Sequence, residues 1–349
     1  MQSINQRNQF LDYTKGILIF LVVYGHIIQY VAYNGNGFFQ DPVFKAIYIF
    51  HMPLFMAISG FISFSSIEKS TFFNITKKRF FNLIVPILSW SILYSITFCL
   101  IEKECTMHSF IRYLTNNITS NFWFLWALFM SIITIAFLKR FNYDKLYGIV
   151  LSFCVVLLIP DKGNIPLFKY TFPFFCIGYL LAQQKEHLEL EVANKSKLLL
   201  TGALFLTISS YLLWNTKTYI YVSGMTNFWS VTLRYFTGFV ASILVMQLVW
   251  KFYKFSSKSF RWFICEIGKG SLYIYILQTY FFTFASKFQY PLHHNFLFLL
   301  SIYPMSAFLL SFCLLQIGNF SERNALVSKL LFGRVSSGNQ SIKQFNSNS

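Results

Sequence analysis

The sequence predicts an all-α fold: a polytopic integral membrane bundle of about ten transmembrane helices, with both termini in the cytoplasm. Hydrophobic residues make up 55% of the chain and charged residues only 12%, a more apolar composition than a soluble core requires. Apolar runs of about 20 residues, long enough to cross a bilayer as a helix, recur between short polar breaks. Together these observations indicate a multi-pass membrane protein.

Each long apolar run is predicted to be one transmembrane helix. The ten predicted spans lie near residues 13–33, 43–64, 82–101, 122–138, 146–160, 167–184, 198–214, 228–250, 270–288 and 295–317. The connecting loops are short, so residues 1–334 are expected to form one transmembrane domain. A polar tail at 335–349 is expected to be disordered. Whatever chemistry the chain performs is therefore expected inside the membrane domain.

Basic residues set the expected orientation, because short loops rich in Lys and Arg stay in the cytoplasm. With cytoplasmic termini and ten spans, most of the 29 Lys and Arg residues fall in inner segments. The formal net charge of +17 is then explained by topology and by attraction to anionic membrane lipid. No nucleic-acid partner is expected.

The six cysteines are expected to form neither a disulfide framework nor a metal site. They show no C-x-x-C spacing, and only Cys105 lies clearly in an outer loop. No metal is predicted elsewhere in the chain.

Two histidines, His26 and His51, lie within the first two predicted spans, where a titratable side chain is costly to bury and indicates a functional site. At about 100° per residue, Lys15 and His26 share one face of the first helix, with Asp12 one turn before Lys15. This face is either a polar track through part of the membrane or an interfacial Asp12–Lys15 pair with His26 bonded to a neighbouring helix.

His51 lies about eight residues into the second span, at a depth similar to that of His26, so both rings could face one cavity. Pro53 bends this helix and frees a carbonyl, while Ser59 and Gly60 permit close packing. The alternative is that His51 only satisfies the carbonyl exposed by the kink.

Six segments in order carry a family resemblance, from about residue 7 to residue 290: LDYTKG followed by Gly25-His26, FHMPLFMAISGF, KKRFFNLIVPILSW, NFWFLWALF, FPFFCIGYLLA and SLYIYILQTYF. The chain resembles membrane acyltransferase family three, which includes bacterial polysaccharide O-acetyltransferases of the fucose O-acetylase type. Lys15 stands where many members have arginine. Asn82 stands where they often have a basic residue, and Gln278 where they frequently have histidine.

The resemblance implies a multi-pass enzyme of the bacterial cytoplasmic (inner) membrane with acetyl-CoA as acyl donor. The implied acceptor is a sugar hydroxyl of a cell-surface polysaccharide or of its lipid-linked precursor. Polysaccharide-assembly proteins are further expected partners. Because polar residues inside a membrane also mark permeation paths, a transporter or flippase of a glycan intermediate is the alternative, and a non-catalytic scaffold is a third.

Acyl transfer from a thioester requires a base or nucleophile, stabilisation of an oxyanion and positive charge for the donor phosphates. His26 is expected to take the acceptor proton or to carry the acetyl group, and His51 to orient it or donate to the oxyanion. Residues expected to bind the donor are Asp12, Lys15, Lys77, Lys78 and Arg79. Topology alone also explains the cluster at 77–79.

Candidates for binding the sugar acceptor come from three later spans. Trp123 and Trp126 lie on one helical face and could stack on a sugar ring, although an interfacial aromatic belt is the simpler explanation. Arg234, inside the eighth predicted span, is a further candidate. Tyr275 and Gln278 in the ninth span complete the set.

Overall fold

The computed structural model describes residues 8–101, 105–184, 204, 206–208, 211–212, 228–286 and 296–333. Every regular element within these ranges is helical, so the predicted all-α fold is confirmed. The predicted tail at 335–349 and most of the predicted span at 198–214 lie outside the described residues.

Seven helical segments in the described part of the chain are long and apolar enough to cross a membrane. They comprise α1 (Gln9–Ile27) with the π-helix η1 (Ile28–Ala32), α2 (Pro42–Glu68), α3 (Phe72–Arg79) running through the π-helix η3 (Phe80–Ile84) into α4 (Val85–Ile101), α6 (Trp123–Arg140), α8 (Ile165–Gln183), α11 (Phe228–Phe255), and α14 (Phe296–Leu300) with α15 (Ile302–Ser321). The polytopic membrane bundle is thereby confirmed.

Two predicted spans form shorter helices. α7 (Leu146–Leu158) has 13 residues and is about 20 Å long, and α13 (Ser271–Ala285) has 15 residues and is about 22 Å long. Both are shorter than the roughly 30 Å of a hydrocarbon core. The count of ten spans therefore remains a prediction. Shorter elements complete the described fold: the 3-10 helix η2 (Phe38–Gln40), α5 (Met107–Asn116), the π-helix η4 (Asn117–Asn121), α12 (Lys258–Lys269) and α16 (Ala325–Phe332).

The first two helices begin at capping residues. The Asn8 side chain accepts hydrogen bonds from two amides of the first turn of α1. The Asp41 side chain does the same for α2, where Pro42 occupies the first helical position. Such caps satisfy amides that have no partner inside the helix. They fix the positions at which the residues of α1 and α2 enter the bundle.

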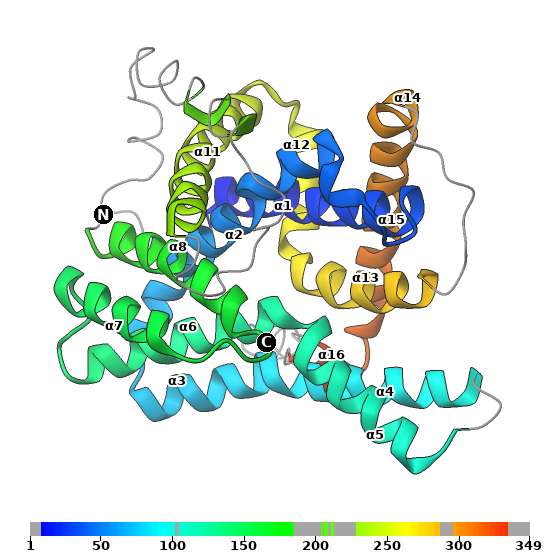
Figure 1. The fold of residues 1–349 in the computed structure, drawn as a ribbon, viewed down its shortest axis with the longest axis horizontal. Helices are drawn as coiled ribbons and strands as arrows, with labels where there is room; N and C mark the ends of the chain where they lie inside the picture. Colours follow the sequence, from blue (N-terminus) through cyan, green and yellow to red (C-terminus); the bar gives the residue numbers. More distant parts are fainter. Residues whose placement is uncertain are drawn as a thin grey trace, which may run out of the picture.

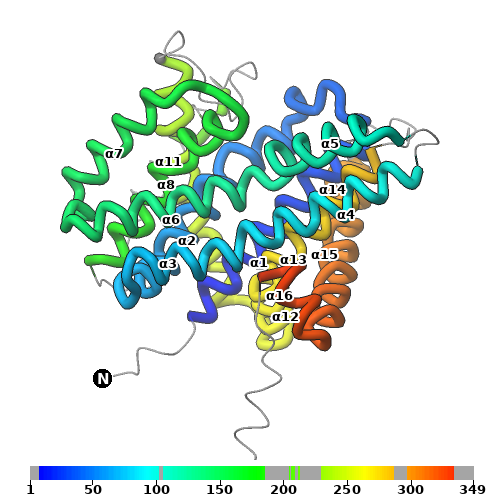
Figure 2. The backbone as a smooth tube through the Cα atoms, turned by 90° about the horizontal axis from the view of Figure 1, so that it is seen from below, coloured from blue at the N-terminus to red at the C-terminus, as the bar shows by residue number. Residues whose placement is uncertain are grey.

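α1 lies near the middle of the molecule, between α2 and α13 (Figures 1 and 2). It packs most extensively on α12, and the two helices cross at glycines. A Cβ atom on Gly16 would lie 2.1 Å from the Ile264 carbonyl oxygen, and one on Gly268 would lie 1.8 Å from that of Asp12. Because neither position has room for a side chain, the backbones approach closely.

α2 packs in the same way on α8, beside it in Figure 1. A Cβ atom on Gly60 would lie 2.0 Å from the Phe175 carbonyl oxygen, and one on Gly178 would lie 1.8 Å from that of Ala57. The close packing predicted at Gly60 is confirmed. This crossing fixes the helix that carries His51.

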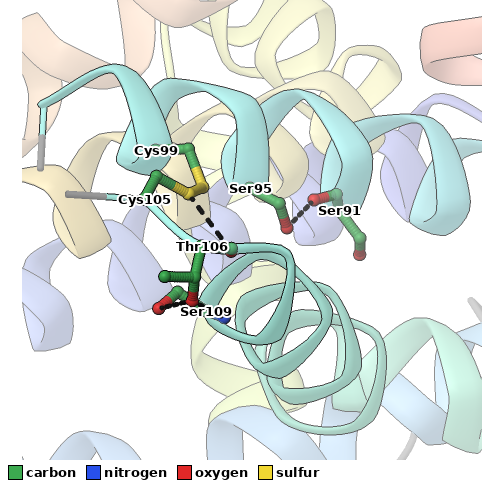
Figure 3. The surroundings of a disulfide bond; sticks show 6 residues. All are labelled: Ser91, Ser95, Cys99, Cys105, Thr106 and Ser109. Atoms are coloured by element: carbon green, nitrogen blue, oxygen red, sulfur yellow. Dashed lines mark hydrogen bonds between the residues drawn. A yellow bond between two sulfur atoms is a disulfide. The ribbon is translucent and has the colours of Figure 1, made fainter.

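Cys99 and Cys105 form a disulfide bond that joins the end of α4 to the segment entering α5 (Figure 3). Their Cα atoms are 5.0 Å apart, within the usual range for a disulfide. The expectation of no disulfide is therefore wrong. Sequence spacing could not reveal the pair, because the contact depends on the chain reversing direction after α4.

Candidate active site

Two adjoining cavities lie beside α1. The histidine cavity, about 220 Å³, is lined by both His26 and His51. The cation cavity, about 250 Å³, is lined by Lys15 and Arg79. Residues that line both cavities are Val22, Met52 and Tyr275. The structure thus brings the two predicted catalytic histidines to one space and two predicted donor-binding cations to the next.

His26 lies in the last turn of α1, between two aromatic rings. Its ring contacts Phe282 edge-on with centroids 5.5 Å apart and Tyr30 with centroids 5.9 Å apart. No described residue forms a hydrogen bond with its Nδ1 atom. The buried Gln278 side chain, on α13, lies next to this ring. Packing between these rings holds the imidazole, and its buried Nδ1 has no hydrogen-bond partner among the described residues.

His51 is held differently, by a hydrogen bond that it donates to its own helix. Its Nδ1 lies 3.0 Å from the Ile47 carbonyl oxygen. A carbonyl can only accept, so Nδ1 carries the proton, and the neutral ring has its lone pair on Nε2. This carbonyl is not the one that Pro53 frees, which belongs to Ile49. The bond to Ile47 fixes the tautomer of His51.

The glycine before His26 allows the two histidines to approach. A Cβ atom on Gly25 would lie 2.7 Å from the Tyr48 ring, which itself contacts His51 with ring centroids 4.2 Å apart. The dipeptide Gly25-His26 thus provides both a reactive group and the space for α2 to bring His51 near it.

In the cation cavity, Lys15 forms a 2.8 Å ion pair with the buried Asp12. Arg79, at the end of α3, faces the same cavity, and its Nε atom makes no hydrogen bond with any described residue. Lys77 and Lys78 are exposed and do not line this cavity. Of the basic cluster on α3, the structure brings only Arg79 to Lys15.

The predicted acceptor-binding residues separate into two groups. Trp123 and Tyr275 line the histidine cavity. Trp126 does not line it, and its indole N–H donates to the Ile118 carbonyl over 2.7 Å. Arg234 is buried beside the Tyr170 ring, 5.8 Å from its centroid, and lines neither cavity.

The histidine cavity is also lined by polar residues that no sequence motif indicated. They are Gln29, Ser120, Asn121, Thr279 and Thr283. Two of these were detectable, because Thr279 and Thr283 follow Tyr275 at steps of four and therefore share its helical face. The other three lie in the π-helices η1 and η4 and gave no such signal. Hydroxyl and amide groups in this number suit a neutral, hydroxyl-rich ligand.

The two cavities differ in chemistry. The cation cavity has largely apolar walls, with two basic side chains among residues such as Ile19 and Phe55. The histidine cavity combines two imidazoles with polar side chains. An elongated ligand with an anionic end could lie across the junction, with its uncharged end near His26.

Comparisons with known proteins cover most of the chain. A family model described as "Acyltransferase domain" matches residues 8–316, which contain every residue of both cavities. Two curated relatives are each called nodulation protein NolL. The one from Mesorhizobium japonicum is 30% identical over 296 residues, 82% of this chain and 79% of the relative. The one from Sinorhizobium fredii is 30% identical over 304 residues, 82% of this chain and 81% of the relative.

No solved structure matches the chain significantly. The family match covers most of the sequence, the helices form a polytopic membrane bundle, and the resemblance found in the sequence motifs is confirmed. The chain therefore belongs to the acyltransferase 3 family of membrane enzymes.

Proposed function

We propose that this protein is an O-acetyltransferase of the bacterial cytoplasmic membrane. It transfers an acetyl group from acetyl-CoA to a sugar hydroxyl of a cell-surface polysaccharide or of its lipid-linked precursor. The observation that carries the proposal is the junction between a cationic cavity and a cavity lined by two histidines. A donor with phosphates at one end and a thioester at the other matches both.

The donor enters from the side of Lys15 and Arg79. These two cations bind the CoA phosphates, and the Asp12 ion pair orients Lys15. Along α1, Lys15 and His26 are separated by a rise of about 16 Å, so the pantetheine arm must cross the apolar part of the cavity. The thioester then lies at the junction with the histidine cavity.

The acceptor binds in the histidine cavity, where Trp123 offers a stacking surface and Asn121 and Thr283 offer hydrogen bonds. Neutral His26 takes the proton of the acceptor hydroxyl as its oxygen attacks the thioester carbon. When the tetrahedral intermediate collapses, the C–S bond breaks and the CoA thiolate takes the proton from His26. In the alternative order, His26 first accepts the acetyl group on nitrogen and then passes it to the sugar.

The disulfide supports the proposed orientation. Disulfides persist on the oxidising side of the bacterial membrane, so this pair supports an outer position for Cys99 and Cys105. Arg79 lies at the opposite end of the same continuous helical segment, at 72–101, and is therefore on the cytoplasmic side. A cytoplasmic Arg79 accords with a donor that is made in the cytoplasm, and it is consistent with the predicted cytoplasmic N-terminus.

The test uses purified protein in liposomes with radiolabelled acetyl-CoA and a candidate glycan acceptor. We expect labelled acetate on the glycan with wild-type protein. Movement of unmodified glycan into the vesicles without acetylation would instead identify a transporter. Glycan NMR of a deletion strain and its parent then identifies the sugar, because the acetyl resonance of the modified position is lost.

A further inference from the structure

Tyr275 occupies a special place between the two cavities. Three described residues line both, and the other two, Val22 and Met52, are apolar. Among the described residues that line both cavities, Tyr275 is therefore the one whose side chain can form a hydrogen bond. It is only 7% exposed, so its hydroxyl acts in a site that excludes most bulk water.

A backbone amide orients this hydroxyl. The Phe124 N–H donates to Tyr275 Oη over 3.4 Å, and the two rings pack with centroids 5.5 Å apart. Because an N–H group can only donate, the phenol oxygen accepts this bond and keeps its own proton for another acceptor. No described residue accepts that proton, so it is available to a ligand at the junction.

The histidines are poorly suited to donate at the same point. His51 uses its Nδ1 proton on the Ile47 carbonyl, and in the neutral ring Nε2 has a lone pair and no proton. His26 must begin the reaction without a proton on the nitrogen that acts as base or nucleophile. The assignment of His51 as oxyanion donor therefore lacks a proton in the neutral state.

We propose, on the basis of the acetyltransferase function above, that Tyr275 is the oxyanion donor. As the attacking atom bonds to the thioester carbon, the carbonyl π electrons move to oxygen, and the Tyr275 O–H donates a hydrogen bond to that oxygen. The C=O double bond re-forms when the C–S bond breaks, and the electron pair leaves with sulfur. Tyr275 keeps its proton throughout. The same contact serves either order of transfer, because both pass through a tetrahedral intermediate.

The test compares Tyr275→Phe with Tyr280→Phe in purified full-length protein. Tyr280 lies on the same helix, its hydroxyl pairs with Thr97 Oγ1 over 2.8 Å, and it lines neither cavity. We expect Tyr275→Phe to lower kcat by about 10²–10³-fold, the usual effect of removing one oxyanion donor. The affinity for CoA should stay within about twofold, because a donor that acts on the transition state contributes little to ground-state binding. Tyr280→Phe should keep wild-type kcat.

Wild-type kcat in Tyr275→Phe, or a loss of CoA affinity that accounts for the whole defect, would overturn the assignment while leaving the proposed function intact. The absence of acetyl transfer by wild-type protein would overturn the function itself. If Tyr275→Phe does not fold, fluorotyrosines at position 275 replace it. The rate should then change with the acidity of the phenol, and a constant rate would contradict the role.

Discussion

At the scale of single residues, His26 and His51 have different surroundings that suit different tasks. His51 is fixed by its hydrogen bond to the Ile47 carbonyl and by the Tyr48 ring. His26 is packed between aromatic rings, and no described residue forms a hydrogen bond with its Nδ1. A base must exchange its proton with ligands during each turnover. This difference favours His26 as the group that exchanges protons and His51 as the group that positions the acceptor.

Replacing His26 by alanine should therefore remove activity and leave the fold intact. We expect His26→Ala to reduce glycan acetate by at least about 10²-fold, the lower range for loss of a general base. The exposed His108 offers a matched control, since His108→Ala changes the same residue type at a position that lines neither cavity. Acetate content by glycan NMR and protein level in the membrane fraction are the measurements. Unchanged acetate in His26→Ala would exclude His26 from the mechanism.

Lys15 should act mainly on donor binding. Loss of a charge-assisted hydrogen bond costs about 1.5–3 kcal/mol, so Lys15→Ala should raise KM for acetyl-CoA by about 10–100-fold. Lys15→Arg should keep most of the affinity, because it retains the charge. The exposed Lys77 is the control, and Lys77→Ala should have a near wild-type KM. A wild-type KM in Lys15→Ala would contradict the role.

At the scale of elements, three π-helical segments among the described residues supply cavity walls. η1 contributes Gln29 and Tyr30, η3 contributes Leu83, and η4 contributes Ser120 and Asn121. A π-helical turn inserts one residue into the helical register and so redirects the side chains that follow. η3 continues directly into α4, whereas η1 and η4 lie at the ends of their helices and present their polar groups to the histidine cavity there.

The crossing of α1 and α2 at Gly25 should be sensitive to one added methyl group. Because a Cβ atom there would overlap the Tyr48 ring, Gly25→Ala should displace this ring and with it His51. Overpacking of this kind typically costs about 1–3 kcal/mol. We expect lower thermal stability and lower kcat in Gly25→Ala. Tyr48→Leu combined with Gly25→Ala should recover part of the stability, and purely additive effects would contradict direct contact.

The Cys99–Cys105 pair provides a test of orientation. In intact cells, a membrane-impermeant maleimide should label Cys105 only after reduction, because the disulfide protects it on the outer face. In a Lys69→Cys variant, the new thiol between α2 and α3 should react only after the membrane is permeabilised. Mass spectrometry of the labelled protein distinguishes the sites. Labelling of Lys69→Cys in intact cells would reverse the proposed orientation.

At the scale of the whole molecule, the fold class could be predicted because composition and hydropathy are properties of the entire chain. The ends of individual helices could not be predicted. Within longer apolar runs, α7 stops before Pro160 and α13 starts after Gly270. For the site, helical periodicity alone related Lys15 to His26. The junction at Tyr275 depends on the packing of α13 against α1 and on the contact of Tyr275 with Phe124 of α6, which no local pattern encodes.

The apolar residues at the junction carry a consequence for the energy supply of the cell. A water-filled passage from the cytoplasm to the outer face would let protons leak and dissipate the proton-motive force. Val22 and Met52 line both cavities, and apolar side chains between two cavities disfavour a continuous water column. Val22→Ser with Met52→Ser should therefore increase proton flux into liposomes that hold a pH-sensitive dye, whereas Ile62→Ser, in the cation cavity alone, should not. A membrane acyltransferase with two adjoining cavities thus also has to remain an electrical insulator.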